Sequence, residues 1–310
     1  MILLIVVITL LIAFAAVLFS VYHMAFYTNR KIHPAADEMP QGEQYVPYVQ
    51  RLAGSVRKLE KLPFEPVEIV SFDGLKLFGR WYDAGKNAPV AIMFHGYRGS
   101  ALRDSSGGAP FCIGRGFSVL LVDQRCHGKS EGITITFGIR ERRDCLSWVN
   151  YVIDRVGENA RIMLMGVSMG AATVMMAADL GLPEQVRAIA ADCGYSSPEE
   201  IISRVAVRMG FPQKPAAFLA RLSARVFGRF DLHESDALRA AKYFSVPVML
   251  IHGDADRMVP CEMSRAVHAA NPEMCTLIEV QGAGHGIAYY VDTDTYEHAA
   301  GIICDIAAGK

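Results

Sequence analysis

Residues 162–172 have the sequence IMLMGVSMGAA, and this stretch decides the interpretation of the chain. A short apolar run, typical of a buried strand, comes first, and small residues that suit the start of a helix follow. Gly166 and Gly170 flank Ser168 in the spacing G-x-S-x-G, which places a serine on a sharp turn from strand to helix. Such a turn exposes the serine Oγ beside the free N–H groups of a helix N-terminus. The pattern predicts a nucleophilic serine; the alternative is an ordinary helix N-cap serine.

Outward from this turn, short apolar runs alternate with longer helix-like stretches. Two β-rich runs on either side of Asp73-Gly74, Val67–Phe72 and Leu75–Tyr82, predict an antiparallel hairpin. The other predicted strands are Val90–Phe94, Ser118–Val122, Ile162–Met165, Val186–Ala190, Val246–Ile251 and Thr276–Val280. Continuous apolar strands separated by helices indicate an α/β fold: a mostly parallel sheet covered by helices on both faces. Ligands bind such sheets at the carboxyl ends of the strands.

Candidate partners for Ser168 follow the last two predicted strands. HGDADRMVP at residues 252–260 contains Asp256, and GAGHG at residues 282–286 contains His285. The acid therefore precedes the histidine, which is the chain order that accompanies G-x-S-x-G. In this hypothesis Asp256 orients His285, and His285 accepts the Ser168 proton.

A glycine-rich loop, HGYRG at residues 95–99, follows the strand predicted at Val90–Phe94. Glycines let the backbone approach a ligand closely. We expect the backbone N–H groups of Tyr97 and Met169 to hold the oxyanion of an acyl-transfer reaction.

Other residues compete for the roles of acid and base. Asp254 suits a turn, and Asp192 closes an earlier strand. The remaining candidate bases are His95, His127, His252, His268 and His298. His95 and His127 lie in motif loops and are expected to brace them, whereas His268 and His298 lie in helical stretches and are expected at the surface.

Together these motifs resemble the serine esterase and peptidase-like branch of the α/β-hydrolase superfamily, from Pro66 to the C-terminus. The motifs are H-G-[YF], D-x-R-x-H-G-x-S, G-x-S-x-G, H-G-x-x-D-x-x-V-P and G-x-G-H, in the family's order. The resemblance implies hydrolysis of a small-molecule carboxylic ester through an acyl-enzyme, with Asp256 as the acid. It also implies that the loop DQRCHGKS at residues 123–130 braces the site. Membrane-tethered bacterial members look most similar.

The same residues leave other functions open. A serine peptidase or amidase and an acyl-CoA thioesterase would use the same Ser-His-Asp triad. A ligand-binding receptor on a hydrolase fold is the alternative from another class, because a fold does not determine a function.

Composition excludes several protein classes. The 310 residues include 31 Lys+Arg and 32 Asp+Glu, a net charge of −1, whereas a nucleic-acid binder of this size is clearly basic. The seven cysteines are scattered and form no C-x-x-C pair, so neither a disulfide framework nor a zinc site is expected. No dinucleotide-binding motif is present, and we expect no cofactor or metal.

The N-terminus predicts a membrane anchor outside the globular core. Met1–Tyr27 contains no Lys, Arg, Asp or Glu, and only Thr9 interrupts the apolar run Ile2–Phe19. A cleaved signal peptide is the alternative. Residues 1–29 are therefore interpreted as a transmembrane anchor, 30–63 as a linker with a short helix near 46–59, and 64–310 as the α/β domain. Arg30 and Lys31 follow the run, which favours a single-pass protein with a cytoplasmic catalytic domain.

A cap is expected at about residues 195–243, where the connection between two strands is unusually long. Ser197-Pro198-Glu199-Glu200 predicts a helix start. A second helix is predicted from Pro215 to Gly228, with Phe218, Leu219, Leu222 and Val226 on one face. Six cations and no acidic residue occur between Ile201 and Phe230. This basic cap suits anionic headgroups or anionic substrates, or it is a solvated helix face.

Overall fold

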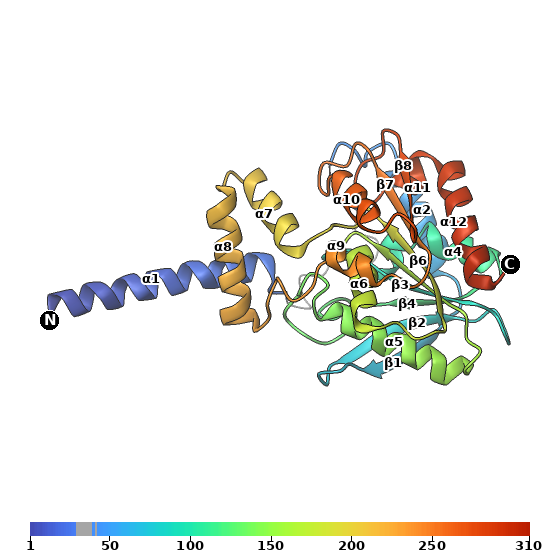
Figure 1. Cartoon of the computed structure of the whole chain (residues 1–310), viewed down its shortest axis with the longest axis horizontal. Helices are drawn as coiled ribbons and strands as arrows, with labels where there is room; N and C mark the ends of the chain where they lie inside the picture. Colours follow the sequence, from blue (N-terminus) through green and yellow to red (C-terminus); the bar gives the residue numbers. More distant parts are fainter. Residues whose placement is uncertain (29–38, 41) are drawn as a thin grey trace.

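The computed structural model describes residues 1–28, 39–40 and 42–310 (Figure 1). Arg30 and Lys31, on which the predicted membrane orientation depends, lie outside the described residues.

A single eight-stranded sheet, in the order β1-β2-β4-β3-β5-β6-β7-β8, organises the described part of the chain. Its strands are β1 (Glu65–Val70), β2 (Lys76–Tyr82), β3 (Val90–Phe94), β4 (Ser118–Val122), β5 (Ile162–Val167), β6 (Val186–Asp192), β7 (Val248–Gly253) and β8 (Cys275–Val280). β2 pairs antiparallel with both β1 and β4, and all other pairs are parallel. The predicted hairpin and the mostly parallel sheet are confirmed. The carboxyl ends of β3 to β8 therefore meet at one edge.

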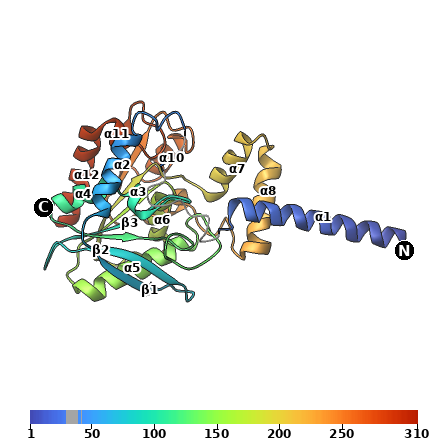
Figure 2. The same ribbon diagram turned by 180° about the vertical axis from the view of Figure 1, so that it is seen from behind.

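Helices cover both faces of this sheet. One face carries α5 (Glu141–Val156), α6 (Met169–Met176), α9 (Ala237–Ala240) and α10 (Glu262–Ala270). The other carries α2 (Val49–Glu60), α3 (Ala101–Asp104), α4 (Gly108–Gly114), α11 (Ala288–Val291) and α12 (Thr293–Ala308), several of which Figure 2 shows together. Successive strand residues face opposite sides. In β3, for example, Ile92 and Phe94 lie in one core and Ala91 and Met93 in the other.

The predicted linker contributes to the second core. Its helix, expected near residues 46–59, forms α2, and Leu52, Val56 and Leu59 are buried. Residues 49–60 therefore pack on the α/β domain. The predicted domain boundary at residue 63 separates two segments that share one hydrophobic core.

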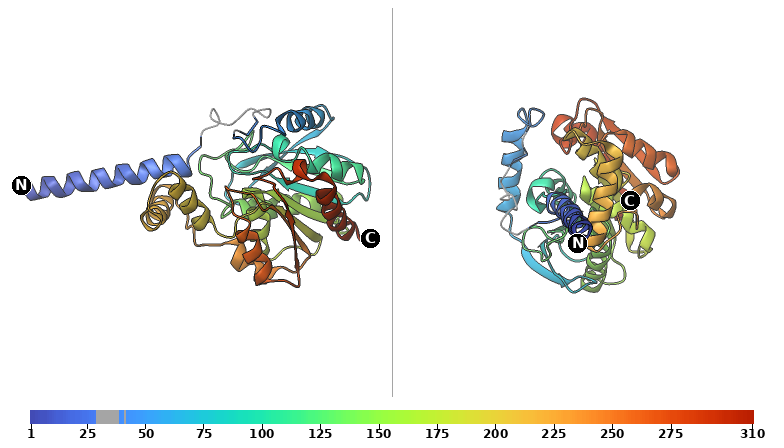
Figure 3. Two further views of the ribbon diagram at one scale, coloured as in Figure 1. Left: turned by 90° about the horizontal axis from the view of Figure 1, so that it is seen from above. Right: turned by 90° about the vertical axis from the view of Figure 1, so that its left-hand side faces the viewer.

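The segment predicted as a cap contains α7 (Pro198–Arg208) and α8 (Gln213–Ser223), followed by a π-helical turn at Ala224–Gly228. The predicted N-cap is confirmed, because the Ser197 side chain accepts a hydrogen bond from the Glu200 N–H. Both cap helices lie to one side of the sheet, and α8 runs across α1 (Ile2–Ala25; Figures 1 and 3).

The expectation that residues 1–27 lie outside the globular core is wrong for their last part. Residues 1–17 are all exposed, but Leu18, Tyr22 and Phe26 are buried, and the last two belong to the main core. The Tyr22 hydroxyl lies 2.6 Å from Thr134 Oγ1. Among the described helices, α1 alone is long and apolar enough to cross a membrane, a property that signal sequences share. Its C-terminal end is also a structural part of the α/β domain.

Candidate active site

Ser168 lies at the turn between β5 and α6, in the conformation expected for the G-x-S-x-G spacing. Its backbone angles are φ 56° and ψ −113°, a strained combination for a residue with a side chain. Gly166 and Gly170 are required because neighbouring backbone atoms occupy the space that a Cβ atom would need. A Cβ at Gly166 would lie 2.2 Å from the Gly170 carbonyl carbon, and one at Gly170 would lie 2.0 Å from the Phe94 oxygen. The turn thus depends on both glycines.

His285 and Asp256 extend from Ser168 in one hydrogen-bonded row. His285 Nε2 lies 2.9 Å from Ser168 Oγ, and His285 Nδ1 lies 2.7 Å from Asp256 Oδ2. The three residues follow β5, β7 and β8, whose carboxyl ends share one sheet edge. The structure therefore brings together the three side chains that the sequence singled out.

Asp256 is fixed as an anion by its surroundings. Its Oδ1 accepts hydrogen bonds from the Met258 and Val259 N–H groups, at 2.7 and 2.9 Å. Burial alone would raise its pKa, but hydrogen bonds from His252 and His285 hold the pKa of Asp256 well below its ordinary value. A carboxylate in this state can orient an imidazole and stabilise its protonated form.

The competing acids occupy other positions. Asp254 is exposed and accepts a hydrogen bond of 2.6 Å from the Gly282 N–H, as a turn residue does. Asp192 is buried, and its Oδ2 accepts a 3.1 Å hydrogen bond from the Tyr296 hydroxyl. Its other oxygen, Oδ1, has no hydrogen-bond partner among the described residues, and burial raises the pKa of Asp192 to about 6. Neither carboxylate is hydrogen-bonded to His285, whose partners are Asp256 and Ser168.

The competing histidines have structural partners. His95 Nε2 accepts from the Gln124 N–H, and His127 Nε2 accepts from the Arg98 N–H, each at 3.0 Å. The expectation that both brace their loops is confirmed. His252 is fully buried between Ser264 Oγ and the Val259 carbonyl, at 2.7 and 2.8 Å.

The two helix histidines lie away from this row. His298 on α12 is exposed as expected, and His268 on α10 is half-buried.

The predicted oxyanion loop is held from several sides. Asp104 Oδ2 accepts the Gly96 N–H at 2.8 Å, and Gln124 and His127 bind the same loop from the segment after β4. Met169 is the first residue of α6, so its N–H belongs to the free N-terminal turn. Within the described part of the chain, no protein group accepts a hydrogen bond from the N–H of Tyr97 or Met169. Both donors are free for a ligand.

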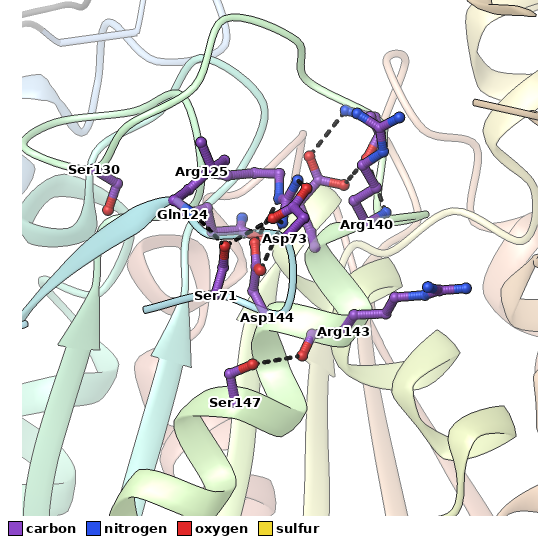
Figure 4. A network of polar contacts seen from close by, with 12 residues as sticks. Ser71, Asp73, Gln124, Arg125, Ser130, Arg140, Arg143, Asp144 and Ser147 are labelled. Atoms are coloured by element: carbon purple, nitrogen blue, oxygen red, sulfur yellow. Dashed lines mark hydrogen bonds and ion pairs between the residues drawn. The ribbon is translucent and has the colours of Figure 1, made fainter. Parts of the chain in front are cut away.

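Arg125 anchors the bracing loop at residues 123–130 (Figure 4). Its buried guanidinium forms a two-pronged ion pair with Asp144, at 2.6 and 2.7 Å, and two contacts of 3.0 Å with Asp73. This network ties the loop after β4 to the β1–β2 hairpin and to α5. The segment that supports His95 and Arg98 is thereby fixed to the core.

A cavity of about 210 Å³ opens beside Ser168 and His285. Its lining includes the tyrosines at positions 45, 97, 289, 290 and 296, with Leu52, Met258 and Ile287. Arg103, Asp104 and Asp192 add charged groups to the lining. Apolar and aromatic walls combined with a few polar groups are typical of sites for small organic ligands.

Tyr45 is a wall residue of this cavity that no sequence pattern marks. It lies in the predicted linker, where no periodicity or motif marks it, yet it is buried in the wall of the cavity. Burial, together with the nearby Cys193 and Asp256, raises the pKa of Tyr45 to about 12. Tyr45 therefore stays a neutral hydrogen-bonding group.

One cluster has the composition of a metal site. Ligand atoms of Cys193, Asp256 and His285 lie within 4.8 Å of one another. However, Asp256 and His285 are bonded to each other, and burial raises the pKa of the Cys193 thiol far above its ordinary value. The other ring nitrogen of His285 lies 2.9 Å from Ser168 Oγ, so both of its nitrogens already have partners. The cluster does not fit a resident metal.

Comparison with known proteins identifies the family to which this fold belongs. The chain belongs to the alpha/beta hydrolase family, whose model matches residues 91–297. It is 24% identical over 182 residues to the uncharacterized protein YqkD of Bacillus subtilis, covering 58% of this chain and 60% of that protein. It is 26% identical over 228 residues to the uncharacterized protein YfhR of Escherichia coli K12, covering 71% and 73%.

Among solved structures, the chain is similar to the esterase Pf2001 of Pyrococcus furiosus. The TM-score is 0.63 at 24% identity, and the match covers 80% of this chain and 91% of the esterase. A likeness at this identity establishes the fold, and the reaction has to be argued from the site.

Proposed function

We propose that this protein is a serine hydrolase that cleaves carboxylic esters through an acyl-enzyme. The observation that carries the proposal is the unbroken row from Ser168 Oγ through His285 to Asp256, at 2.9 and 2.7 Å, beside an open cavity. A nucleophile bonded to a base that a third group orients is the arrangement that activates a hydroxyl group.

In the first half-reaction, Ser168 Oγ attacks the ester carbonyl carbon while its proton passes to His285 Nε2. The carbonyl oxygen becomes an oxyanion, which the N–H groups of Tyr97 and Met169 hold; one such donor is typically worth about 3 kcal/mol. The tetrahedral intermediate then collapses. His285 returns the proton to the departing alcohol oxygen, and the acyl group stays on Ser168.

In the second half-reaction, water attacks the acyl-enzyme and gives its proton to His285. Collapse of the second intermediate releases the carboxylic acid, and the proton returns to Ser168. Asp256 stays ionised throughout, which its depressed pKa supports. The bond broken is an acyl C–O bond, and no cofactor is needed.

We also propose that α1 is a single-pass anchor and that the catalytic domain is cytoplasmic. The exposed apolar stretch of α1 supports the first statement. All seven cysteines are free and buried, as in proteins of a reducing compartment, which supports the second.

The test is labelling of the full-length protein with a fluorophosphonate probe, followed by peptide mass spectrometry, with Ser168→Ala as the control variant. An adduct on Ser168 alone is the expected result. Matched esters, thioesters and aminoacyl amides are then compared as substrates. Faster turnover of the amide or of an acyl-CoA would replace the ester assignment by a peptidase or a thioesterase. A folded protein without an adduct would contradict the catalytic proposal.

A further inference from the structure

We propose that the cap is a membrane-binding surface whose partner is a bilayer with anionic headgroups. The surface consists of the exposed residues Val207–Pro215 together with the outer side of α8, including Phe218. This inference rests on the proposed membrane anchor. It adds that the cap lies in the bilayer interface at the point where α1 leaves the hydrocarbon core.

The packing of α8 leaves part of its apolar stripe exposed. The buried side of α8 and of the turn that follows it carries small residues, Ala220, Ser223 and Ala224. Ser223 Oγ donates a 2.8 Å hydrogen bond to the Leu18 carbonyl of α1. The large apolar residues predicted to share one face, Phe218, Leu219, Leu222 and Val226, are exposed or half-buried. An amphipathic helix normally buries its large apolar side chains.

The turn between α7 and α8 continues this uncovered surface. Met209 and Phe211 are 56% and 54% exposed, and Phe218 on α8 is 53% exposed. Single exposed apolar residues need no explanation, whereas several large ones within residues 209–218 are typical of an interaction site.

The position of α8 on α1 identifies a bilayer as the partner. α8 lies nearer than α7 to the N-terminal end of α1, and the exposed part of α1 projects beyond it (Figures 1 and 2). Phe227, in the turn after α8, contacts Phe19 and Tyr22 of α1 at ring distances of 5.4 and 6.0 Å. The cap and the end of the apolar helix are therefore one packed unit.

The length of the exposed stretch places this unit in the interface. Residues 2–17 rise about 24 Å at 1.5 Å per residue, whereas a hydrocarbon core is about 30 Å thick. Because the exposed stretch is shorter than the hydrocarbon core, spanning the bilayer places the crossing of α1 and α8 at the boundary between hydrocarbon and headgroups. Interfacial helices lie at this level, with apolar side chains about 5 to 10 Å deep.

The charge of the cap is complementary to anionic headgroups. Arg204, Arg208, Lys214, Arg221, Arg225 and Arg229 are the charged residues between Ile201 and Phe230. Arg204 and Arg225 pair with Glu200 and Asp231, just outside this stretch. Long cationic side chains extend to the headgroups while their stems cover apolar surface. Exposed apolar side chains together with cationic side chains match a lipid surface with anionic headgroups better than an apolar protein partner.

Fluorescence depth measurements on the full-length protein in phosphatidylglycerol vesicles test the inference. Three variants each add one tryptophan: Phe218→Trp in the cap, Leu11→Trp in α1, and Ile306→Trp on α12 at the far end of the domain (Figure 1). The native Trp81 and Trp148 are buried and provide a constant background. Lipids brominated on the acyl chains quench only tryptophans within the bilayer.

We expect blue-shifted and strongly quenched emission from the added tryptophan in the Phe218→Trp and Leu11→Trp variants. In the Ile306→Trp variant we expect neither a blue shift nor quenching. We also expect the quenching of Phe218→Trp to weaken in phosphatidylcholine vesicles. Quenching of Leu11→Trp without quenching of Phe218→Trp would overturn the cap inference and leave the anchor standing. Absence of quenching in both would overturn the anchor as well, and the labelling of Ser168 tests the catalytic proposal separately.

Discussion

Asp192 is a buried carboxylate whose charge should cost the folded protein stability, and Asp192→Asn tests this directly. Its Oδ1 is buried without a hydrogen-bond partner among the described residues, and Asp192 lines a cavity of about 30 Å³. Burial raises the pKa of Asp192 to about 6, against about 3.9 in an unfolded chain. The folded protein therefore binds the proton more tightly than the unfolded chain does.

The sign and size of the effect follow from linkage. Between these two pKa values the folded state holds more protons, so the free energy of unfolding falls as the pH rises. The full cost is about 3 kcal/mol, because two pKa units at 1.36 kcal/mol each separate the states. About half of it, roughly 1.4 kcal/mol, develops between about pH 5 and pH 8. In the Asp192→Asn variant this contribution is absent.

Thermal unfolding of the full-length protein, followed by circular dichroism at several pH values, measures the effect. The variant should gain stability relative to the wild type as the pH rises from about 5 to 8, with the difference levelling off above about pH 6.5. The buried amide can cost about 1 to 3 kcal/mol by itself, but that cost does not depend on pH. The matched control is Asp254→Asn, because Asp254 is exposed. Parallel pH profiles for the wild type and Asp192→Asn would refute the reasoning.

Further predictions concern the proposed catalytic row, the turn, the cavity and α1. Asp256→Asn should lower kcat on p-nitrophenyl acetate by about 10⁴-fold, because the amide selects the wrong imidazole tautomer; a loss below about tenfold would contradict its role. Gly170→Ala should destabilise the fold by about 3 kcal/mol or more in thermal unfolding, whereas Gly114→Ala, whose Cβ meets nothing within 4 Å, should be tolerated. Acetyl and butyryl esters should be hydrolysed faster than octanoyl esters, because the cavity of about 210 Å³ is small; the reverse order would contradict this. Deleting residues 1–17 should leave the melting temperature nearly unchanged, and deleting residues 1–28 should lower it, because Tyr22 and Phe26 are buried; equal melting temperatures would disprove a structural role for the end of α1.

The sheet was predictable because its strands are continuous apolar runs. β3 and β4 begin and end at the predicted residues. Placing Ser168, Asp256 and His285 together needed only one further step, because parallel strands bring their carboxyl ends to the same edge. The distances within the row could not be predicted, since they depend on the conformations of the loops after β7 and β8.

The predictions for α1 and α8 differ from the structure because their sequence patterns do not show which side of each helix packs against the rest of the protein. α1 is apolar on all sides, so its composition cannot show that Tyr22 and Phe26 pack into the core while residues 1–17 do not. In α8 the large apolar residues suggest one buried face, but packing against α1 uses the small residues Ala220 and Ser223. Close helix contacts favour small side chains, and a single sequence does not reveal which partner is present.

The end of α1 links the proposed anchor to the proposed chemistry. The Tyr97 hydroxyl donates to the Ala25 carbonyl at 2.9 Å, and the Arg98 guanidinium donates to the carbonyls of Met24 and Tyr27, at 3.0 and 3.2 Å. The last carbonyls of a helix have no intrahelical partners, so these contacts satisfy groups that would otherwise be unpaired. The same loop carries the Tyr97 N–H that we assign to the oxyanion. Because a donor must lie within a few tenths of an ångström of its position to stabilise the transition state, the helix end and the oxyanion loop are one structural unit. The anchor is therefore expected to influence the geometry of the site as well as its location.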